Sequence, residues 1–316
     1  MTRVILSRVL GAVPILILVS LITFGMIHLI PGGPAAAIAG LDATPQRIAE
    51  IRHNLGLDQP LVVQFYRWYA DLLHGNLGTS LLLGVPVMHA IGIRLPVTLG
   101  LSAYAMVITV VLGLVSGIVA ALKQNTWIDQ AAMVFSMIGI SLPNFYLALL
   151  MIIVFAVDLG WLPSGGYVPF LADPLGWLAS MTLPAVSLAL LLTGLLARIT
   201  RSTMLEVLRQ DYIRTARAKG LPGRQVVMKH ALANAMIPII TIIGITVSLL
   251  LSGAVVTEVV FSIPGIGQLL TEAVLHRDYP MVQGGVLVVT ALMVLVNVVV
   301  DIVYAFLDPR VRYDAS

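Results

Sequence analysis

The sequence predicts an all-helical protein that crosses a membrane several times. Of its 316 residues, 59% are hydrophobic and only 10% are charged, a balance far more apolar than that of soluble globular domains. Charge-free stretches recur along the chain, each with the roughly 20 residues that a helix needs to cross a bilayer core. Unpaired backbone groups are costly in hydrocarbon, and the stretches lack the alternation of barrel strands, so each stretch is expected to be a helix.

Six of these stretches are expected to form membrane helices. They lie at about residues 9–30, 97–122, 130–157, 175–197, 232–257 and 279–307. Arginines precede the first stretch and small residues follow it, as in a cleaved signal peptide. The stretch is longer than the roughly 7 to 15 residues of a signal-peptide core, so we interpret it as a retained first helix.

The distribution of lysine and arginine predicts the orientation. With the N-terminus in the cytoplasm, most of the 18 lysine and arginine residues fall on the cytoplasmic side. The exceptions are Arg47, Arg52, Arg67, Arg94 and Arg277. Cytoplasmic loops are enriched in these residues, so both termini are expected to be cytoplasmic.

Two segments outside the membrane are too long to be simple turns. Residues 31–95 contain amphipathic pieces and predict a small extracytoplasmic cap, either a lid over helix ends or a docking place for a delivery partner. Residues 258–278 contain the helix-breaking pair Pro264 and Gly265 and predict either a re-entrant or surface helix or a packed connector. We therefore expect two parts, residues 1–94 with the first helix and the cap, and residues 95–316 as the transmembrane domain.

The cytoplasmic loop at residues 198–230 combines basic charge with helix signals. Asp211 is expected to cap a short helix at residues 212–219, Gly220 to end it in a left-handed conformation, and Pro222 to prevent its continuation. Membrane topology requires the charges, but it requires neither the cap nor a second helix after the turn. The small side chains of Thr215 and Ala216 are expected to let the short helix lie close to a partner protein.

The sequence lacks the motifs of the common enzyme classes. It contains no phosphate-binding GxxxxGK[ST] loop, no HExxH pair and no nucleophile elbow. Its 0 cysteines exclude disulfides and thiolate metal sites, and its 6 histidines show no ligand spacing. We therefore expect no catalytic residue, metal site or cofactor in this chain. An integral-membrane enzyme is accordingly disfavoured.

Polar residues within the apolar stretches are further candidates, because burying them in a membrane is costly. Asn144 follows the proline of the "SLPNF" helix break, and Glu258 lies at the end of the fifth stretch. Asn297 and Asp301 lie one turn apart on the last helix, where either a polar contact within the bundle or a role with the substrate is consistent with the spacing. These four are candidate bundle or gate residues. Because Asp301 is a single acid where a proton relay needs several, a proton-driven carrier is disfavoured.

Longer motifs extend from one end of the chain to the other. They are "HLIPGGPA", "LGLDQPL", "RLPVTL", "GWLPSGGY", "RITRSTMLEVLRQDYIRTARAKGL", "TEVVFSIPGIGQLL", "RDYPMVQGG" and "DIVYAFLDPRVRY". Together they resemble the permeases of binding-protein-dependent ABC importers, in particular the B-type subunit of the dipeptide, oligopeptide and nickel class. Ala216, Gly220 and Leu232 match the cytoplasmic signature of that family. The residues that depart from it are Arg214, Thr215, His230 and Ala233.

The resemblance implies a type I ABC importer permease fold in a bacterial inner membrane. It also implies a homologous second permease subunit, two cytoplasmic ABC ATPases that bind ATP and magnesium, and an extracytoplasmic substrate-binding protein. The short cytoplasmic helix would be the coupling helix, which docks in an ATPase groove. Its expected residues are Asp211, Tyr212, Arg214, Thr215, Ala216, Arg217, Lys219 and Gly220.

The expected cargo is a dipeptide or oligopeptide. Nickel, glutathione or another small solute is an alternative cargo within the same importer class. An autonomous channel or secondary carrier is the rival from a different class. The coupling-like loop and the motifs that span the whole chain favour the importer.

Overall fold

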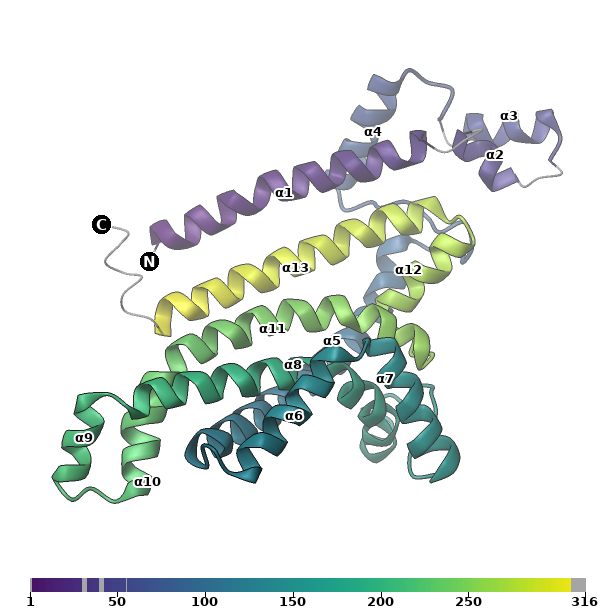
Figure 1. Cartoon of the computed structure of the whole chain (residues 1–316). Helices are drawn as coiled ribbons and strands as arrows, with labels where there is room; N and C mark the ends of the chain where they lie inside the picture. The colour runs from purple at the N-terminus through teal and green to yellow at the C-terminus, as the bar shows by residue number, and fades with distance from the viewer. Residues whose placement is uncertain (1, 30–32, 40–42, 55, 308–316) are drawn as a thin grey trace. The chain divides into compact units, whose positions relative to one another are not determined.

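The protein is built from helices, as Figure 1 shows. The computed structural model describes residues 2–29, 33–39, 43–54 and 56–307. Within these residues every element is helical, apart from an isolated antiparallel bridge between Thr79 and Pro86. The predicted all-helical class is therefore confirmed for the described part of the chain.

The chain divides into two compact units. Unit 1 comprises Met1–Ile5, Thr98–Pro264 and Val296–Ser316, and unit 2 comprises Leu6–Val97 and Gly265–Leu295. Three long helices, α1 (Thr2–His28), α5 (Val87–Leu122) and α13 (Tyr279–Leu307), contribute to both units.

Unit 1 contains most of the long apolar helices. Besides its shares of α1, α5 and α13, it consists of α6 (Trp127–Ser141), α7 (Asn144–Met151), the π-helix η1 (Ile152–Asp158), α8 (Pro174–Leu208), α9 (Asp211–Ala218), α10 (Gly223–Gln225), the π-helix η2 (Val226–Ala231) and α11 (Leu232–Val260).

Unit 2 contains α1 (Thr2–His28) from Leu6 onward and the shorter helices. These are α2 (Gly33–Ala39), α3 (Pro45–Asn54), α4 (Leu61–Leu73) and α12 (Ile266–Leu275). A buried carboxylate organises the loop before α5. Asp278 is 1% exposed and accepts hydrogen bonds from the Ser80 hydroxyl and from the backbone N–H groups of Leu81, Leu82 and Met281.

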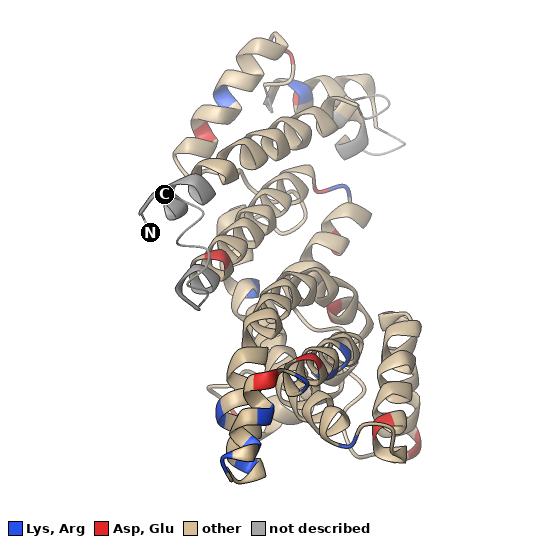
Figure 2. Ribbon diagram, turned by 60° about the vertical axis from the view of Figure 1, so that its left-hand side comes forward, with Lys and Arg blue, Asp and Glu red and all other residues tan. Residues whose placement is uncertain are grey.

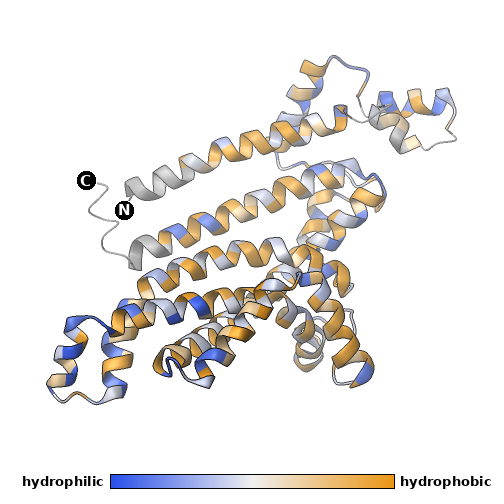
Figure 3. Cartoon of the chain, viewed as in Figure 1, coloured by the Kyte–Doolittle hydropathy of each residue, from blue (hydrophilic) through white to orange (hydrophobic). Residues whose placement is uncertain are grey.

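Five helices of the described chain are long and apolar enough to cross a membrane. They lie at Leu10–His28, Val87–Leu122, Pro174–Leu208, Gly223–Val260 and Tyr279–Ile302. Figure 3 shows the apolar residues along these helices, and Figure 2 shows how sparse charged residues are on them.

The stretch expected as a single span at residues 130–157 is instead two helical arms bent by 108°. The break follows from Pro143, which has no N–H to continue α6 and which disfavours helical geometry at the residue before it. Leu142 accordingly has an extended backbone, with φ −90° and ψ 131°. With the bent pair taken as one span, the described chain has up to 6 spans.

Helix α8 is the central helix of unit 1, and 61% of its most apolar segment is buried within the chain. Neighbouring helices approach it closely at glycines. A Cβ atom on Gly117 of α5 would lie 2.6 Å from the carbonyl oxygen of Ala197, and one on Gly194 of α8 would lie 2.5 Å from that of Ser136 in α6. Such close backbone contact requires glycine, as is common where helices pack in membranes.

Candidate functional site

The α9 loop, residues 209–222, is the first candidate site, and α9 is fastened to unit 1 by one face. Ile213 is fully buried and Ala216 is 8% exposed. Both belong to an apolar cluster with residues of α8, η2 and α11, including Met204, Val226, Ala231 and Ala235. An isolated helix of 8 residues is not stable in water, so this packing holds α9 in position.

The start of α9 differs from the sequence prediction. Asp211 is the first helical residue rather than the cap, and Gln210 occupies the cap position without a capping side-chain bond. Gln210 has the extended geometry of a cap, with φ −69° and ψ 149°. The helix therefore begins at Asp211, one residue earlier than predicted. The Asp211 carboxylate lies at the positive end of the helix dipole and accepts a 3.4 Å hydrogen bond from Arg214.

The end of α9 is the one predicted. Gly220 has a positive φ of 76° and donates its N–H to the carbonyl oxygen of Arg217 at 2.9 Å. Leu221 donates its N–H to the carbonyl oxygen of Ala216 at 3.3 Å. These two bonds form a Schellman motif, in which a left-handed glycine satisfies the last carbonyl groups of the helix. Gly220 therefore fixes the length of α9.

The prediction that Thr215 and Ala216 together form an exposed small-residue face of α9 is wrong. Ala216 points inward, whereas Thr215 is exposed and donates its hydroxyl to the carbonyl oxygen of Asp211 at 3.0 Å. Consecutive residues on a helix point about 100° apart, so Ile213 and Ala216 share the inner face and Thr215 does not.

The outer face of α9 and the following turn are polar and carry the basic residues Arg214, Arg217 and Lys219. Figure 3 shows hydrophilic residues in blue at α9 and α10. The exposed residues of the predicted set are Asp211, Tyr212, Arg214, Thr215, Arg217, Lys219 and Gly220. The Arg214 and Asp211 side chains are 75% and 94% exposed, so their ion pair is weak and both groups remain available to a partner.

The segment after the turn leads directly into α11, as predicted. Pro222 precedes α10, and the helix continues through the π-helical turn η2 into α11. Lys229 and His230 lie in the last turn of η2. A π-helical turn is a local widening that is frequent at functional sites.

Three of the four predicted polar residues of the bundle, Asn144, Glu258 and Asn297, make hydrogen bonds between helices of unit 1. The Asn144 amide donates to the Thr257 hydroxyl at 3.0 Å, and the Asn144 amide oxygen is buried without a hydrogen-bond partner among the described atoms. Glu258 is fully buried, and its carboxylate accepts a 2.6 Å hydrogen bond from Thr98.

On α13, Asn297 contacts the neighbouring helix. Its amide oxygen accepts a 2.5 Å hydrogen bond from Ser248 of α11, and Asp301 is half-buried one turn later. The polar contact expected within the bundle is thus made by Asn297. With Asn144 and Glu258, it gives α11 polar contacts to α7, α5 and α13.

A buried ion pair between α6 and α8 was missed by the sequence analysis. The Asp129 carboxylate accepts hydrogen bonds from Nε and Nη2 of Arg201 at 2.5 and 2.7 Å. It also accepts the Asn125 backbone N–H at 3.0 Å. The Asp129 and Arg201 side chains are 4% and 24% exposed. A lone acid at the start of an apolar stretch was the available signal for Asp129.

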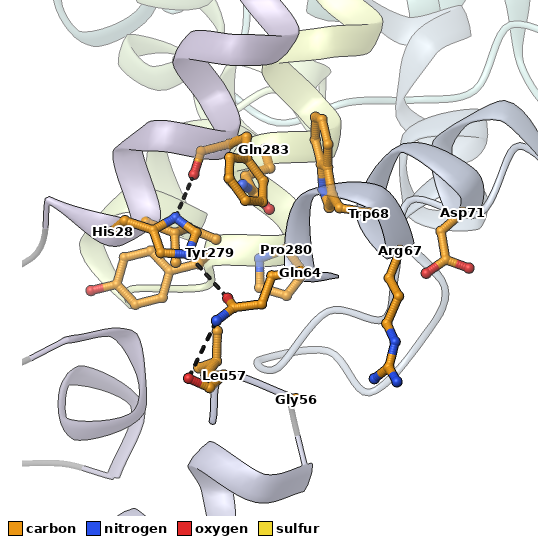
Figure 4. A pocket seen from close by; sticks show the side chains of 12 residues that line it. His28, Gly56, Leu57, Gln64, Arg67, Trp68, Asp71, Tyr279, Pro280 and Gln283 are labelled. Carbon is orange, nitrogen blue, oxygen red and sulfur yellow. Dashed lines mark hydrogen bonds between the residues drawn. The ribbon is translucent and has the colours of Figure 1, made fainter. Parts of the chain in front are cut away.

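A pocket of about 270 Å³ lies within unit 2 (Figure 4). It is lined by Phe24, Ile27, His28, Gly56, Leu57, Gln64, Arg67, Trp68, Asp71, Tyr279, Pro280 and Gln283. Gln64 bridges its walls, because its Oε1 lies 3.1 Å from Nε2 of His28 and its Nε2 donates to the carbonyl oxygen of Leu57 at 3.3 Å. Figure 4 shows Arg67 and Asp71 pointing away from this bridge.

The turn between α3 and α4 lies beside this pocket and is closed by a polar pair. His53 Nδ1 lies 2.9 Å from the Asp58 carboxylate, and Gly56 between them has a φ of 65°. The hydrogen bond with His53 holds the pKa of Asp58 below its usual value. Among the described residues, no group of three or more histidine, cysteine or acidic side chains could hold a metal ion.

Two family models match the chain. Residues 110–313 match the model described as binding-protein-dependent transport system inner membrane component. Residues 1–102 match the model for the N-terminal part of such membrane components.

Named relatives are similar over nearly the whole chain. A peptide transport system permease protein of Brucella abortus (strain 2308) is 51% identical over 314 residues, which are 99% of this chain and 100% of that protein. The dipeptide transport system permease protein DppB of Alkalihalophilus pseudofirmus is 42% identical over 329 residues, covering 98% of each. The glutathione transport system permease protein GsiC of Salmonella paratyphi A is 44% identical over 313 residues, covering 99% of this chain and 100% of that protein.

A solved structure shares the fold. The MetNI methionine ABC transporter, in inward-facing conformations, superposes with a TM-score of 0.55 at 19% identity, covering 70% of this chain and 97% of that chain. At this identity the similarity concerns the fold alone.

Proposed function

Because the chain belongs to the family of binding-protein-dependent transport system inner membrane components, we propose that it is a permease subunit of an ATP-driven importer in a bacterial inner membrane. The bent pair α6 and α7 then counts as one span, which gives six spans with both termini in the cytoplasm. The fold shared with the MetNI transporter supports a type I importer arrangement. The two matched regions support a division into residues 1–94 and 95–316.

The α9 loop is the coupling site of this subunit. The observation that carries this assignment is the two-sidedness of α9, because Ile213 and Ala216 anchor it while Tyr212, Arg214 and Arg217 remain exposed. Gly220 ends the helix sharply, so α9 forms a short, defined ridge. Its positive charge suits an acidic or polar groove on a partner.

Anchoring matters because a coupling element must transmit movement in both directions. If α9 were joined to the bundle only by flexible loops, a displacement by the partner would move α9 alone and leave the transmembrane helices in place. The inner face of α9 packs against α8, η2 and α11, so displacement of α9 carries the ends of two long helices with it. Packed interiors resist deformation and move as bodies, which makes this connection stiff.

The polar contacts of α11 are suited to respond to that movement. Asn144, Glu258 and Asn297 link this helix to α7, α5 and α13. Polar contacts between membrane helices contribute only about 0.6 kcal/mol on average, so they can exchange partners as helices rotate. We assign these residues, with Asp301, to the gate of the translocation path.

Peptides are the proposed cargo. The relatives named for peptide, dipeptide and glutathione transport support this choice, since glutathione is itself a small peptide. Nickel or another small solute remains the alternative within the same importer class. An autonomous channel or secondary carrier is disfavoured, because α9 is shaped for a partner rather than for solvent.

The importer requires partners. They are a homologous second permease, two ABC ATPases that bind ATP and magnesium, and an extracytoplasmic substrate-binding protein. No catalytic step is assigned to this chain. The cap in unit 2 faces the binding protein in this arrangement.

Native mass spectrometry of gently extracted complexes tests the assembly. We expect this chain together with a second permease and ATPase subunits. A chain that is always recovered alone would refute the importer assignment. The ligand that co-purifies with the binding protein, identified by mass spectrometry, tests the cargo, and a non-peptide ligand would refute the peptide assignment.

A further inference from the structure

Helices α6 and α8 touch at three levels along their length, and the ion pair of Asp129 and Arg201 is the first of them. The other two levels are glycine contacts, where a Cβ on Gly194 would lie 2.5 Å from the Ser136 carbonyl oxygen and one on Gly139 would lie 2.9 Å from that of Leu190. Residue numbers rise along α6 as they fall along α8, so the two helices run antiparallel in a defined register.

The glycine contacts let the two helices approach closely, but they do little to fix how far one helix is shifted along the other. Glycines lack the side chains that interlock as ridges and grooves and thereby oppose sliding. The ion pair supplies what they lack, because the arginine fork meets both carboxylate oxygens and tolerates little displacement. Asn125 adds a third bond to the same carboxylate, so the connection between α5 and α6 is held at the same point.

The energetics also indicate a positioning role. A buried ion pair recovers little net stability compared with an apolar pair of similar volume, because both charges lose their hydration. The best-attested use of such groups is to specify one arrangement among alternatives. The same helix α8 ends at Leu208, directly before the α9 loop.

We propose that Asp129 and Arg201 are positioning residues for coupling. They lock α6 to α8, so that displacement of α9 reaches α6 and the bend at Pro143, where Asn144 contacts α11. Without the lock, α8 slides along α6 and the movement is lost before the bend. This inference rests on the proposed function, because it takes α9 as the point where the partner acts.

The test uses the complete importer, with its ATPases and binding protein, in proteoliposomes. In the double variant Asp129→Asn with Arg201→Met, no buried charge is left alone, and the asparagine oxygen still accepts the Asn125 N–H. We expect normal assembly and ATP hydrolysis, but uptake per ATP should fall about fivefold or more. About fivefold is the lower end of the range over which one site of a protein typically affects another. Radiolabelled dialanine is the cargo probe.

Two further variants separate positioning from general stability. Arg201→Lys keeps the charge but not the fork, so we expect an intermediate loss of uptake per ATP. The control variant is Lys123→Gln, which removes an exposed charge from the loop between α5 and α6 without touching the buried pair. It is expected to leave uptake per ATP unchanged.

A distance measurement tests the register directly, without cargo or partners. The chain has 0 cysteines, so Trp127→Cys and Glu206→Cys, both at exposed positions near the pair, can carry two spin labels. We expect one narrow distance distribution by pulsed electron resonance in the otherwise parental chain. It should broaden or shift in the double variant.

The outcomes are distinct. If the parental importer takes up no dialanine, the peptide assignment fails while the distance measurement still decides the present inference. An unchanged distance distribution overturns the register lock. If uptake and ATP hydrolysis fall in equal proportion, the pair serves stability alone and the positioning role is refuted.

Discussion

Replacement of Ile213 by alanine tests whether α9 is held by its inner face. The substitution removes three carbon atoms from a side chain with 0% exposure. At about 0.8 kcal/mol for each buried carbon, the loss is about 2.4 kcal/mol, and measured substitutions of this kind cost about 2–5 kcal/mol. The α9 loop lies at one end of its unit, where neighbouring side chains can partly fill the cavity left by the substitution. The expected loss is therefore about 2.4 kcal/mol, near the lower end of the measured range.

That loss acts on docking of α9 more than on the whole chain. An increase of about 2.4 kcal/mol in favour of the undocked helix raises its population about 60-fold, and backbone amides that exchange through local opening accelerate by the same factor. Hydrogen exchange followed by mass spectrometry measures this for the purified chain in nanodiscs. We expect faster exchange across the α9 loop and unchanged exchange in the centre of α8.

Thr215→Ala is the matched control, because Thr215 lies on the exposed face of the same helix. Its exchange is expected to remain within about threefold of the parent, as for ordinary surface substitutions. If Ile213→Ala behaves like this control, α9 is not anchored by its inner face. Displacement of α9 would then not be passed to α8 and α11 through this face.

Three further substitutions probe backbone geometry and buried polar groups. Gly220→Pro is expected to abolish ATP-driven uptake in proteoliposomes or prevent assembly, because proline cannot adopt positive φ and removes the N–H donated to Arg217. Gly194→Ala is expected to cost about 1–3 kcal/mol, read as a lower midpoint of thermal unfolding, because its Cβ would meet the Ser136 carbonyl. Asp278→Ala leaves the buried N–H of Met281 unpaired at about 1–3 kcal/mol, removes the bonds to Leu81 and Leu82, and should increase proteolysis in the loop before α5.

Gly223→Ala is the control for both glycine substitutions, since nothing lies within 4 Å of its Cβ position and its φ is not positive. Unchanged uptake in Gly220→Pro would remove the coupling assignment of the α9 loop. An unfolding midpoint of Gly194→Ala equal to that of Gly223→Ala would contradict close packing of α6 and α8. For Asp278→Ala, proteolysis at the parental rate would show that the loop holds without the carboxylate.

Local signals in the sequence were sufficient for the C-terminal end of α9 and for most membrane helices. Gly220 with Pro222 predicted where α9 stops, because glycine alone adopts left-handed geometry without strain and proline cannot continue a helix. The start was misplaced by one residue, because aspartate is favoured both at a cap and in the first turn. The bend at Pro143 was read as a break within one span, and its 108° angle was not predictable.

The buried face of α9 and the ion pair between α6 and α8 escaped sequence reasoning. Thr215 and Ala216 are neighbours in sequence but lie on different faces of α9, and only the packing of α9 against its unit decides which face is buried. Arg201 was counted as one cation of a basic region. Its role depends on Asp129, which lies 72 positions earlier in the chain.

The sequence by itself determined the helical class, the apolar spans, the site of the α9 loop and the family. Each of these depends on residues that are close in the chain, because a helix in a membrane satisfies its own backbone groups and needs no distant partner to form. The tertiary structure decided the anchoring of α9, the polar contacts of α11 and the lock between α6 and α8. Those contacts join residues far apart in sequence, and their geometry exists only once the helices have packed.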